Sequence, residues 1–275
     1  MCTGYGWFMR PAAACALFLV PSLAAAEAGN PLSDRFSLSL GTFLLDTSTE
    51  LRVDGTSGRG TEIDAEQDLG LHNTDSFRFD GYWRFKERHK LRVLFFNSTR
   101  SDSHIIDREI TIRDTVYPVN AQIDTHFGTR VTELAYEYAF LRREKYEIAA
   151  TAGLHNLRFR LGVSANQTAS GGTAELSQDA NADGPLPVIG LRGIWRFGKQ
   201  WALDAQAQFF KIHIEPYDGR LEDYTASVVW MPFTHVGLGA GYNEFVTRVD
   251  VSADRFNGRL RWRYGGARIF VTASF

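Results

Sequence analysis

The side chains with the most evident chemistry are charged groups that recur at every second position of otherwise apolar segments. Arg78 and Asp80 are two residues apart, and Glu133 and Glu137 are four apart. Arg84 is in phase with Arg78 and Asp80, and Arg192 and Arg196 are four apart. In other segments, single residues of this set occupy the polar positions: Arg92, Asp204, Asp223 and Arg268. In an extended backbone, residues two or four apart lie on one face, so these groups would face a common interior. Acids and bases confined there must pair, because an unpaired buried charge is costly.

This charge set is compatible with two functions. Fully paired, it would be a structural salt-bridge network that fills the interior of the fold. Partly paired around an opening, it would be a constriction that selects ions or small solutes by charge. The sequence leaves both interpretations open.

Two histidines lie near carboxylates, in the sequences Asp124-Thr125-His126 and Asp102-Ser103-His104. Asp124 and His126 are the candidates for catalysis, against the simpler interpretation that they are polar surface residues at a strand end. The chain has no Gly-x-Ser-x-Gly, no His-Glu-x-x-His, no P-loop and no dinucleotide-binding fingerprint. We therefore assign no catalytic residue from sequence alone, and expect no cofactor.

An acidic stretch carries Glu62, Asp64, Glu66 and Asp68 at alternating positions. An extended backbone would place these carboxylates on one side, where they could bind divalent cations. The stretch lacks the Asp-x-Asp-x-Asp-Gly frame of a calcium loop, so we expect a solvated loop and no metal site.

Ten segments alternate with period two, which is typical of strands with one apolar and one polar face. They are residues 35–45, 76–85, 90–99, 127–141, 145–157, 187–197, 200–214, 221–231, 235–246 and 258–275. Short turns near 86–89, 142–144, 198–199 and 232–234 alternate with connections that are mostly longer, such as 46–75, 100–126 and 158–186. This alternation predicts a single antiparallel, up-and-down transmembrane β-barrel of ten strands, with both termini at the short-turn end.

Two details of this barrel are open to test. Eight strands is the alternative number, if 221–231 and a neighbouring segment are not strands of the barrel. The period-two phase slips at Phe209-Phe210 and at Gly265-Gly266, which predicts β-bulges at both places.

The aromatic residues favour a membrane barrel. Trp83, Trp195, Trp201 and Trp230 all lie close to a short turn, as expected of amphipathic rings at a membrane boundary. The sequence assigns a second girdle, at the other boundary, to Tyr224, Tyr242, Trp262 and Tyr264.

The first 26 residues have the pattern of an export signal. Arg10 precedes a short apolar run, and small residues lead up to a cleavage site after Ala26. Cleavage would remove both cysteines, Cys2 and Cys15, and leave a barrel domain of residues 27–275, which suits an oxidising compartment. The formal net charge of −2 becomes −3 without Arg10, and this balance argues against nucleic acid as a partner.

The last nine residues, 267–275, alternate between apolar and mostly polar positions and end on Phe275. A secreted chain whose final strand ends in Phe resembles the outer-membrane β-barrel proteins of Gram-negative bacteria. The resemblance implies that Phe275 belongs to a signal for the barrel-assembly machinery. It also implies an outer-membrane location, with membrane lipids and lipopolysaccharide as partners.

The resemblance and the strand number narrow the function to two classes. Eight strands enclose only side chains and sixteen leave a channel, so a ten-stranded barrel is expected to be nearly filled. We therefore expect a structural or narrow-pore role. The alternative is an enzyme with its site at the extracellular rim, either omptin-like or modifying lipid A. The omptin proteases are ten-stranded, and Asp124 and His126 resemble their Asp–His pair, but their Asp-x-Asp partner is absent here. The oligomeric state stays open.

Overall fold

The computed structural model describes residues 29–55, 58, 60–72, 76–169, 172–214, 217–253 and 256–275, so the expected signal peptide lies outside it. Most of the described chain is in ten long strands. They are β1 (Phe36–Val53), β3 (Ser76–Lys86), β4 (His89–Ile105), β7 (Gln122–Arg142), β8 (Tyr146–Ala169), β9 (Gly172–Arg196), β10 (Trp201–Ile214), β11 (Tyr217–Trp230), β12 (Val236–Ala253) and β13 (Phe256–Ser274). Among the described residues, no helix is long and apolar enough to cross a membrane.

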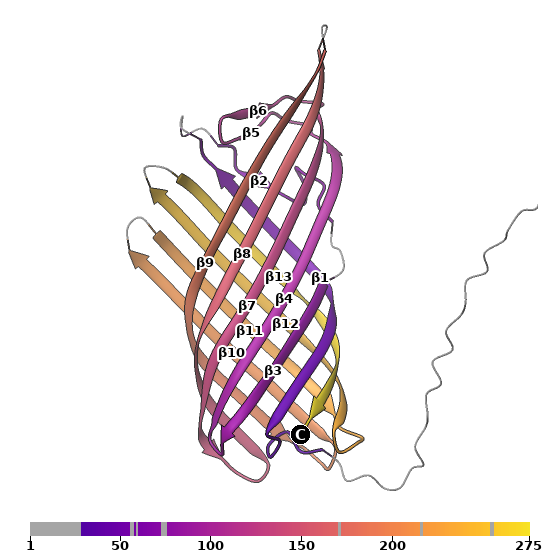
Figure 1. Ribbon diagram of the computed structural model, residues 1–275, viewed down its shortest axis with the longest axis vertical. Coiled ribbons are helices and arrows are strands. Elements are labelled where there is room, and N and C mark those ends of the chain that lie inside the picture. Colours follow the sequence, from indigo (N-terminus) through magenta and orange to yellow (C-terminus); the bar gives the residue numbers. More distant parts are fainter. Residues whose placement is uncertain are drawn as a thin grey trace, which may run out of the picture.

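The ten strands form a closed antiparallel barrel (Figure 1). Each long strand pairs with its neighbours in the chain, and β13 pairs with β1 from Ser37–Ser274 to Val53–Gly258. The predicted fold and strand number are confirmed. Four short connections lie at one end, here called the turn end, together with the C-terminus. The other end, which carries the small strands β2, β5 and β6, is here called the cap end.

The strands at the cap end are longer than the sequence predicts. Residues expected in the connections 100–126 and 158–186 mostly continue β4, β7, β8 and β9. The β8–β9 ladder runs from Tyr146–Trp195 to Ala169–Gly172. Period two continues in this region with the two faces exchanged. Apolar residues such as Phe159, Leu161 and Val163 face inward and are buried, whereas in the membrane belt the apolar residues face outward. A search for one continuous apolar outward face therefore ends where the exchange begins.

The barrel wall is split at the cap end between β9 and β10. Their ladder stops at Ile189–Phe209, although β9 continues to Gly172 and β10 to Ile214. In this register Val188 would follow opposite Phe210, and Pro187 and Pro185 would then lie opposite Lys211 and His213, at the positions of β9 whose N–H groups should point toward β10. A proline has no N–H to donate to a ladder, which explains why the pairing ends there.

Neither predicted bulge is present. The registers of β10–β11 and β12–β13 run without interruption through Phe209-Phe210 and Gly265-Gly266. The irregular positions lie instead at Arg84–Lys86 and Ala139–Leu141. The apparent phase slip has another cause: the barrel interior is apolar toward the cap end, so an inward-facing residue such as Phe210 is no longer polar.

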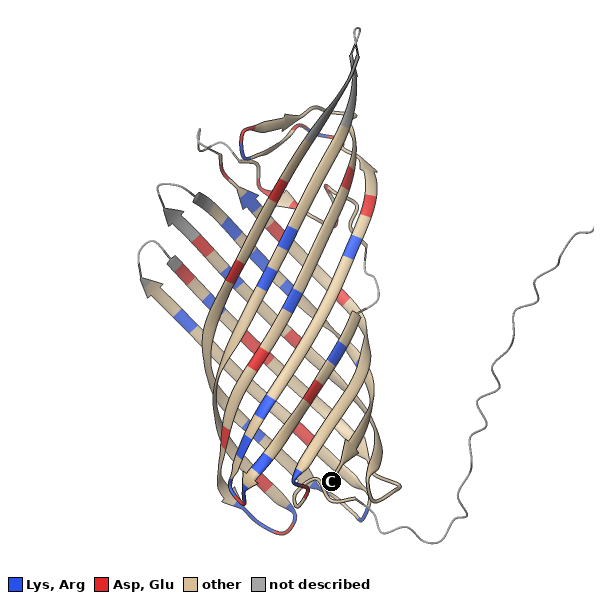
Figure 2. Cartoon of the chain, viewed as in Figure 1, with Lys and Arg blue, Asp and Glu red and all other residues tan. Residues whose placement is uncertain are grey.

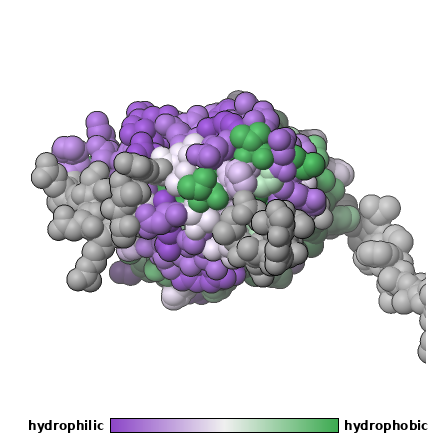
Figure 3. All heavy atoms as spheres, turned by 90° about the horizontal axis from the view of Figure 1, so that it is seen from above, coloured by the Kyte–Doolittle hydropathy of each residue, from purple (hydrophilic) through white to green (hydrophobic). Residues whose placement is uncertain are grey.

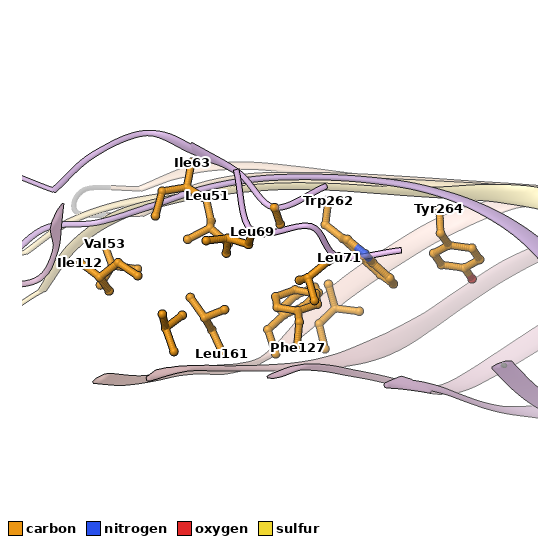
Figure 4. Packing of buried hydrophobic residues seen from close by; sticks show 14 of the residues in the cluster. Leu51, Val53, Ile63, Leu69, Leu71, Ile112, Phe127, Leu161, Trp262 and Tyr264 are labelled. Atoms are coloured by element: carbon orange, nitrogen blue, oxygen red, sulfur yellow. The ribbon is translucent and has the colours of Figure 1, made fainter. Parts of the chain in front are cut away.

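Three small strands and their loops close the cap end from inside. They are β2 (Ile63–Asp64), β5 (Ile110–Ile112) and β6 (Thr115–Tyr117). Ile63, Leu69 and Leu71 pack with Ile112, Phe127 and Trp262 in one apolar cluster (Figure 4). Seen from this end, the outer surface is mainly hydrophilic with a few apolar patches (Figure 3).

Replacing both Pro185 and Pro187 by threonine should extend the β9–β10 ladder toward the cap end. The two added N–H groups would let Lys211 and His213 pair with β9, because the register places them opposite these prolines. We expect the amides of Lys211 and His213 to become more slowly exchanging in hydrogen–deuterium exchange, while those of β10 near Trp201 stay unchanged. Unchanged exchange at Lys211 and His213 would show that something other than the missing donors ends the ladder.

Candidate functional site: a filled lumen and an outer hollow

The predicted charged residues face the barrel interior, mostly in its turn half. They are buried or nearly so: Arg78, Asp80, Arg84, Arg92, Glu133, Glu137, Arg192, Asp204, Asp223 and Arg268. Arg196 is half-buried at the turn end of β9 and makes no ion pair within the described chain. Charged bands cross most of the strands in this half (Figure 2). Three further residues in phase with this set, which sequence reasoning missed, are Lys90, Glu147 and His155.

Glu137 is the centre of the first ion-pair cluster. Its carboxylate accepts a hydrogen bond from Arg92 Nε at 2.6 Å. Lys90 Nζ lies 3.8 Å away and Arg192 Nη1 4.0 Å away. Arg192 also pairs with Asp204. Residues from β4, β7, β9 and β10 are therefore tied together through a carboxylate that is only 1% exposed.

Glu147 is the centre of a second cluster, nearer the turn end. Arg84 Nη1 donates to it at 2.7 Å, Lys90 Nζ also donates to it, and Arg142 Nε lies 3.6 Å away. The sequence contained a signal for both missed members. Lys90 precedes Arg92 by two residues and so lies on the same face of its strand. Glu147 follows the turn at 142–144 and precedes the inward-facing Ala149 by two residues.

Asp80 and Asn243 connect a third cluster across the seam where the barrel closes. Arg78 Nε lies 3.2 Å and Arg268 Nη1 3.1 Å from the Asp80 carboxylate. Asn243 accepts a hydrogen bond from Arg78 and donates one to Asp223 at 2.8 Å. The cluster thus joins β3, β11, β12 and β13.

His155 marks the border between the charged and the apolar half of the lumen. Gln208 Nε2 donates to Glu133 at 2.7 Å, so its Oε1 accepts from His155 Nε2 at 3.0 Å. The imidazole also lies 5.9 Å from the Phe245 ring. The polar network therefore ends directly against aromatic side chains.

An aromatic layer fills the lumen on the cap side of His155. Phe96 and Tyr264 stack with centroids 4.7 Å apart, and Phe245 and Tyr264 stack at 5.2 Å. Trp262 is 2% exposed and packs against Phe159. The prediction that Trp262 and Tyr264 belong to an outer girdle is therefore wrong. Period two fixes which residues share a face but not which face is inside, and an apolar interior resembles a lipid-facing surface.

The turn end is closed by the residues that precede β1. Leu32 is buried there, and its carbonyl accepts from Arg142 Nη2 at 2.9 Å. Tyr82 donates to the carbonyl of Pro31 at 3.1 Å. Above this segment, a chamber of about 50 Å³ is left, with Arg92, Arg192 and Arg268 in its wall. That volume suits a few water molecules.

Phe275 lies at the turn end with its ring largely exposed. The ring stacks on His235 at 4.9 Å, and the Phe275 carbonyl accepts from the amide of Phe36 at 2.8 Å. The final residue thus joins the closing seam through its backbone and leaves its ring at the surface. Its role as an assembly signal stays a prediction.

Asp124 and His126 lie outside the barrel, on the outward face of β7 near the cap end. Ser101 Oγ and His126 Nδ1 are hydrogen-bonded at 2.8 Å, and Ser103 donates to Asp124. These residues line an open hollow of about 660 Å³, here called the outer hollow. Its wall includes Ser101, Ser103, Asp124, His126, Ser177 and Asp179. Asp124 and His126 each bind a serine of β4 rather than each other.

The carboxylates of the acidic stretch form hydrogen bonds within the loops that close the cap end. Asp64 accepts from the amides of Glu66 and Gln67, and Glu66 accepts from the Thr49 amide at 2.8 Å. Burial raises the pKa of Asp68, but hydrogen bonds from Arg108 and the Asp64 amide outweigh it and hold that pKa below its usual range. No group of three potential metal ligands occurs among the described residues.

Comparison with known proteins gives a fold but no family. No family model matches the chain, and neither does any curated protein sequence. Among solved structures, the outer membrane protease OmpT from Escherichia coli matches with a TM-score of 0.54 and 12% identity, over 87% of this chain and 96% of that one. The protein has the fold of an outer-membrane β-barrel.

Two further solved structures resemble this barrel more loosely. The toluene transporter TodX of P. putida covers 90% of this chain and 93% of its own, at 8% identity and a TM-score of 0.37. The attachment invasion locus protein Ail of Yersinia pestis covers 88% and 99%, at 9% identity and a TM-score of 0.34. At these identities the likeness concerns the fold alone.

Replacing Glu137 by alanine should be among the most destabilising single changes in the lumen. Arg92 would lose its carboxylate in a dry site, and removing one partner of a buried ion pair costs about 3–5 kcal/mol. Leu134→Ala, on the outward face of the same strand, should cost less, because the side chain is half-exposed and lipid can fill the gap. Urea unfolding from lipid vesicles compares the two. Equal or reversed costs would show that water reaches the lumen.

The stability of the barrel should depend on pH through Asp34 at the turn end. Burial raises the pKa of this carboxyl to about 6, against the opposing effects of Ser274, His235 and Arg84. The folded chain then holds the proton more tightly than the unfolded chain, so stability rises as the pH falls through 6 toward 4. Asp34→Asn should flatten this dependence. Unfolding free energies measured from pH 4 to 8 test it, and identical profiles for the two proteins would contradict it.

Proposed function

We propose that the protein is a closed, non-conducting barrel of the outer membrane with a structural role. In this proposal its interactions with other molecules take place at the outer surface of the cap end. The observation that carries this proposal is the filling of the lumen at three successive levels. Leu32 and its neighbours close the turn end, the ion-pair clusters cross the middle, and the aromatic layer with Trp262 fills the cap half. A solute path would have to displace all three.

The outward surface supports placement in a membrane. Large apolar side chains point outward around the barrel, and Ile189 is 69% and Leu238 50% exposed. Aromatic residues beside the short turns, such as Trp195 and Trp230, extend this belt to the turn end. The similarity to outer-membrane barrels points the same way, with the short turns in the periplasm.

Outer-membrane lipids and lipopolysaccharide are the expected partners of this belt. Just beyond it on the cap side, Arg130 lies directly opposite Arg158, and Arg160 is next along β8. Like charges in directly opposed positions repel, and the one carboxylate Asp183, which forms an ion pair with Arg158 and also attracts Arg160, leaves this group with a surplus of positive charge. Anionic headgroups at this height would supply the missing negative charge.

The two ends of the chain would direct its export and its assembly into the membrane. Cleavage after Ala26 would release the barrel domain of residues 27–275 on the far side of the inner membrane. The barrel-assembly machinery would then recognise the terminal strand with Phe275, whose aromatic ring stays accessible in the folded barrel.

The outer hollow favours a second candidate function, an enzyme acting at the extracellular rim. It gathers a carboxylate, an imidazole and hydroxyl groups, which are the side chains that activate water or a hydroxyl nucleophile. Asp124 and His126 would be its residues. Their separate pairing with Ser103 and Ser101 makes this the weaker of the two candidates.

Purified protein reconstituted in planar lipid bilayers should give no discrete channel openings. A variant that lacks residues 29–34 should also stay silent, because the ion-pair clusters and the aromatic layer remain. Adding Phe96→Ala, Phe245→Ala and Trp262→Ala to that deletion should also give no openings, because the ion-pair clusters still cross the lumen. A sixteen-stranded porin in the same bilayers serves as the positive control.

Reproducible openings of the unmodified protein would contradict the proposal and favour the narrow pore. Silence together with peptide or lipid A hydrolysis that is lost in both Asp124→Ala and His126→Ala would favour the enzyme.

A further inference from the structure

One edge of the barrel wall is free at the cap end. Beyond the Ile189–Phe209 pair, residues 172–188 of β9 pair with β8 on one side. On the other side, no strand of the described chain pairs with them. Figure 1 shows β8 and β9 continuing to the tip while the β10–β11 hairpin leans away. The gap therefore exposes a strand edge.

The two prolines reveal which backbone groups face this edge. The β8–β9 register runs without interruption through Pro185 and Pro187, so their nitrogens, which cannot donate, face the gap. N–H and C=O groups of alternate residues point to the same side of a strand. The odd-numbered residues from Thr173 to Asp183 therefore direct donors and acceptors outward from the edge. Such a row is a template for another strand.

This edge is held in place from inside the barrel. Gln178 Nε2 donates to Thr115 Oγ1 on β6 at 3.0 Å, and Tyr117 donates to the Val163 carbonyl on β8 at 3.1 Å. The small β5–β6 sheet thus supports the wall on its inner face. A partner strand would meet a preformed edge and lose little free energy in ordering it.

The outer hollow reaches this edge and adds chemical selectivity. Ser177 and Asp179 of β9 belong to its wall, together with Asp124 of β7. Between them, Gly162 has no side chain, and a Cβ placed there would lie 3.1 Å from Asp179 Oδ1. The Asp179 carboxylate therefore leans over Gly162 into the hollow, where it can meet a cationic group.

We propose that the edge of β9 binds an extended segment of another polypeptide by strand addition, with a lysine or arginine of that segment beside Asp179. Main-chain hydrogen bonds to Ser177, Asp179, Asn181 and Asp183 would supply affinity. The outward basic side chain would enter the outer hollow, and small apolar side chains would face inward beside Ala180 and Ala182. Strand addition generally divides affinity and specificity in this way. The inference is independent of whether the lumen conducts.

The test uses the full protein refolded in detergent and a fluorescent, end-blocked nonapeptide of alternating lysine and valine. Asn181→Pro removes one N–H from the free edge, whereas Asn181→Ala retains it, so the two variants form a matched pair. From the loss of a hydrogen bond and the strain on its neighbours, Asn181→Pro should weaken binding about tenfold and Asn181→Ala less than about twofold. Fluorescence anisotropy gives both dissociation constants.

A second variant keeps the proposal falsifiable if Asn181→Pro does not fold. Asp179→Asn should weaken binding of the lysine peptide, and a peptide of alternating glutamate and valine should bind the unmodified protein much more weakly. The proposal is overturned by equal affinity for the two peptides, or by equal effects of the two Asn181 substitutions. Sedimentation that shows two copies of the barrel joined through β9, with the peptide excluded, would also overturn it.

Discussion

The backbone ladder between β1 and β13 is the interaction on which the rest of the structure depends. It runs from Ser37–Ser274 to Val53–Gly258 and leaves no open edge in the belt of the barrel. Closure of this kind is what hydrocarbon requires, because backbone groups there have no water to bind. Once the ladder is closed, period two sends every second residue of all ten strands into one narrow interior, and that interior has to be filled.

The two halves of the lumen are filled in different ways. In the turn half, carboxylates such as Glu137 and Glu147 each contact several cations, so a few buried acids hold strands that are not neighbours. In the cap half, aromatic rings around Tyr264 replace the charges. His155 joins the two halves through Gln208 and Phe245. Charges paired this closely leave little room for a solute, which is why the outer surface of the barrel carries the proposed interactions.

The cap end departs from a regular barrel for a local reason. Pro185 and Pro187 remove the donors that β10 would need, so the wall divides and β9 keeps a free edge. Inside the barrel, the apolar residues of β2, β5 and β6 fill the cap end, which the long strands alone would leave open. The same region therefore combines a rigid inner support with an accessible outer edge.

The sequence by itself determined the number of strands, the positions of the short turns and the parity of the side chains. These follow from a local period, so Arg78, Glu133 and Arg268 could be assigned to one face without knowing their partners. Tertiary structure alone decided that Glu137 pairs with Arg92, that Gln208 links Glu133 to His155, and that Trp262 is inside. Alternation fixes which residues share a face of a strand. Which side chains pair depends on the register between strands, and which face points inward depends on what fills the lumen.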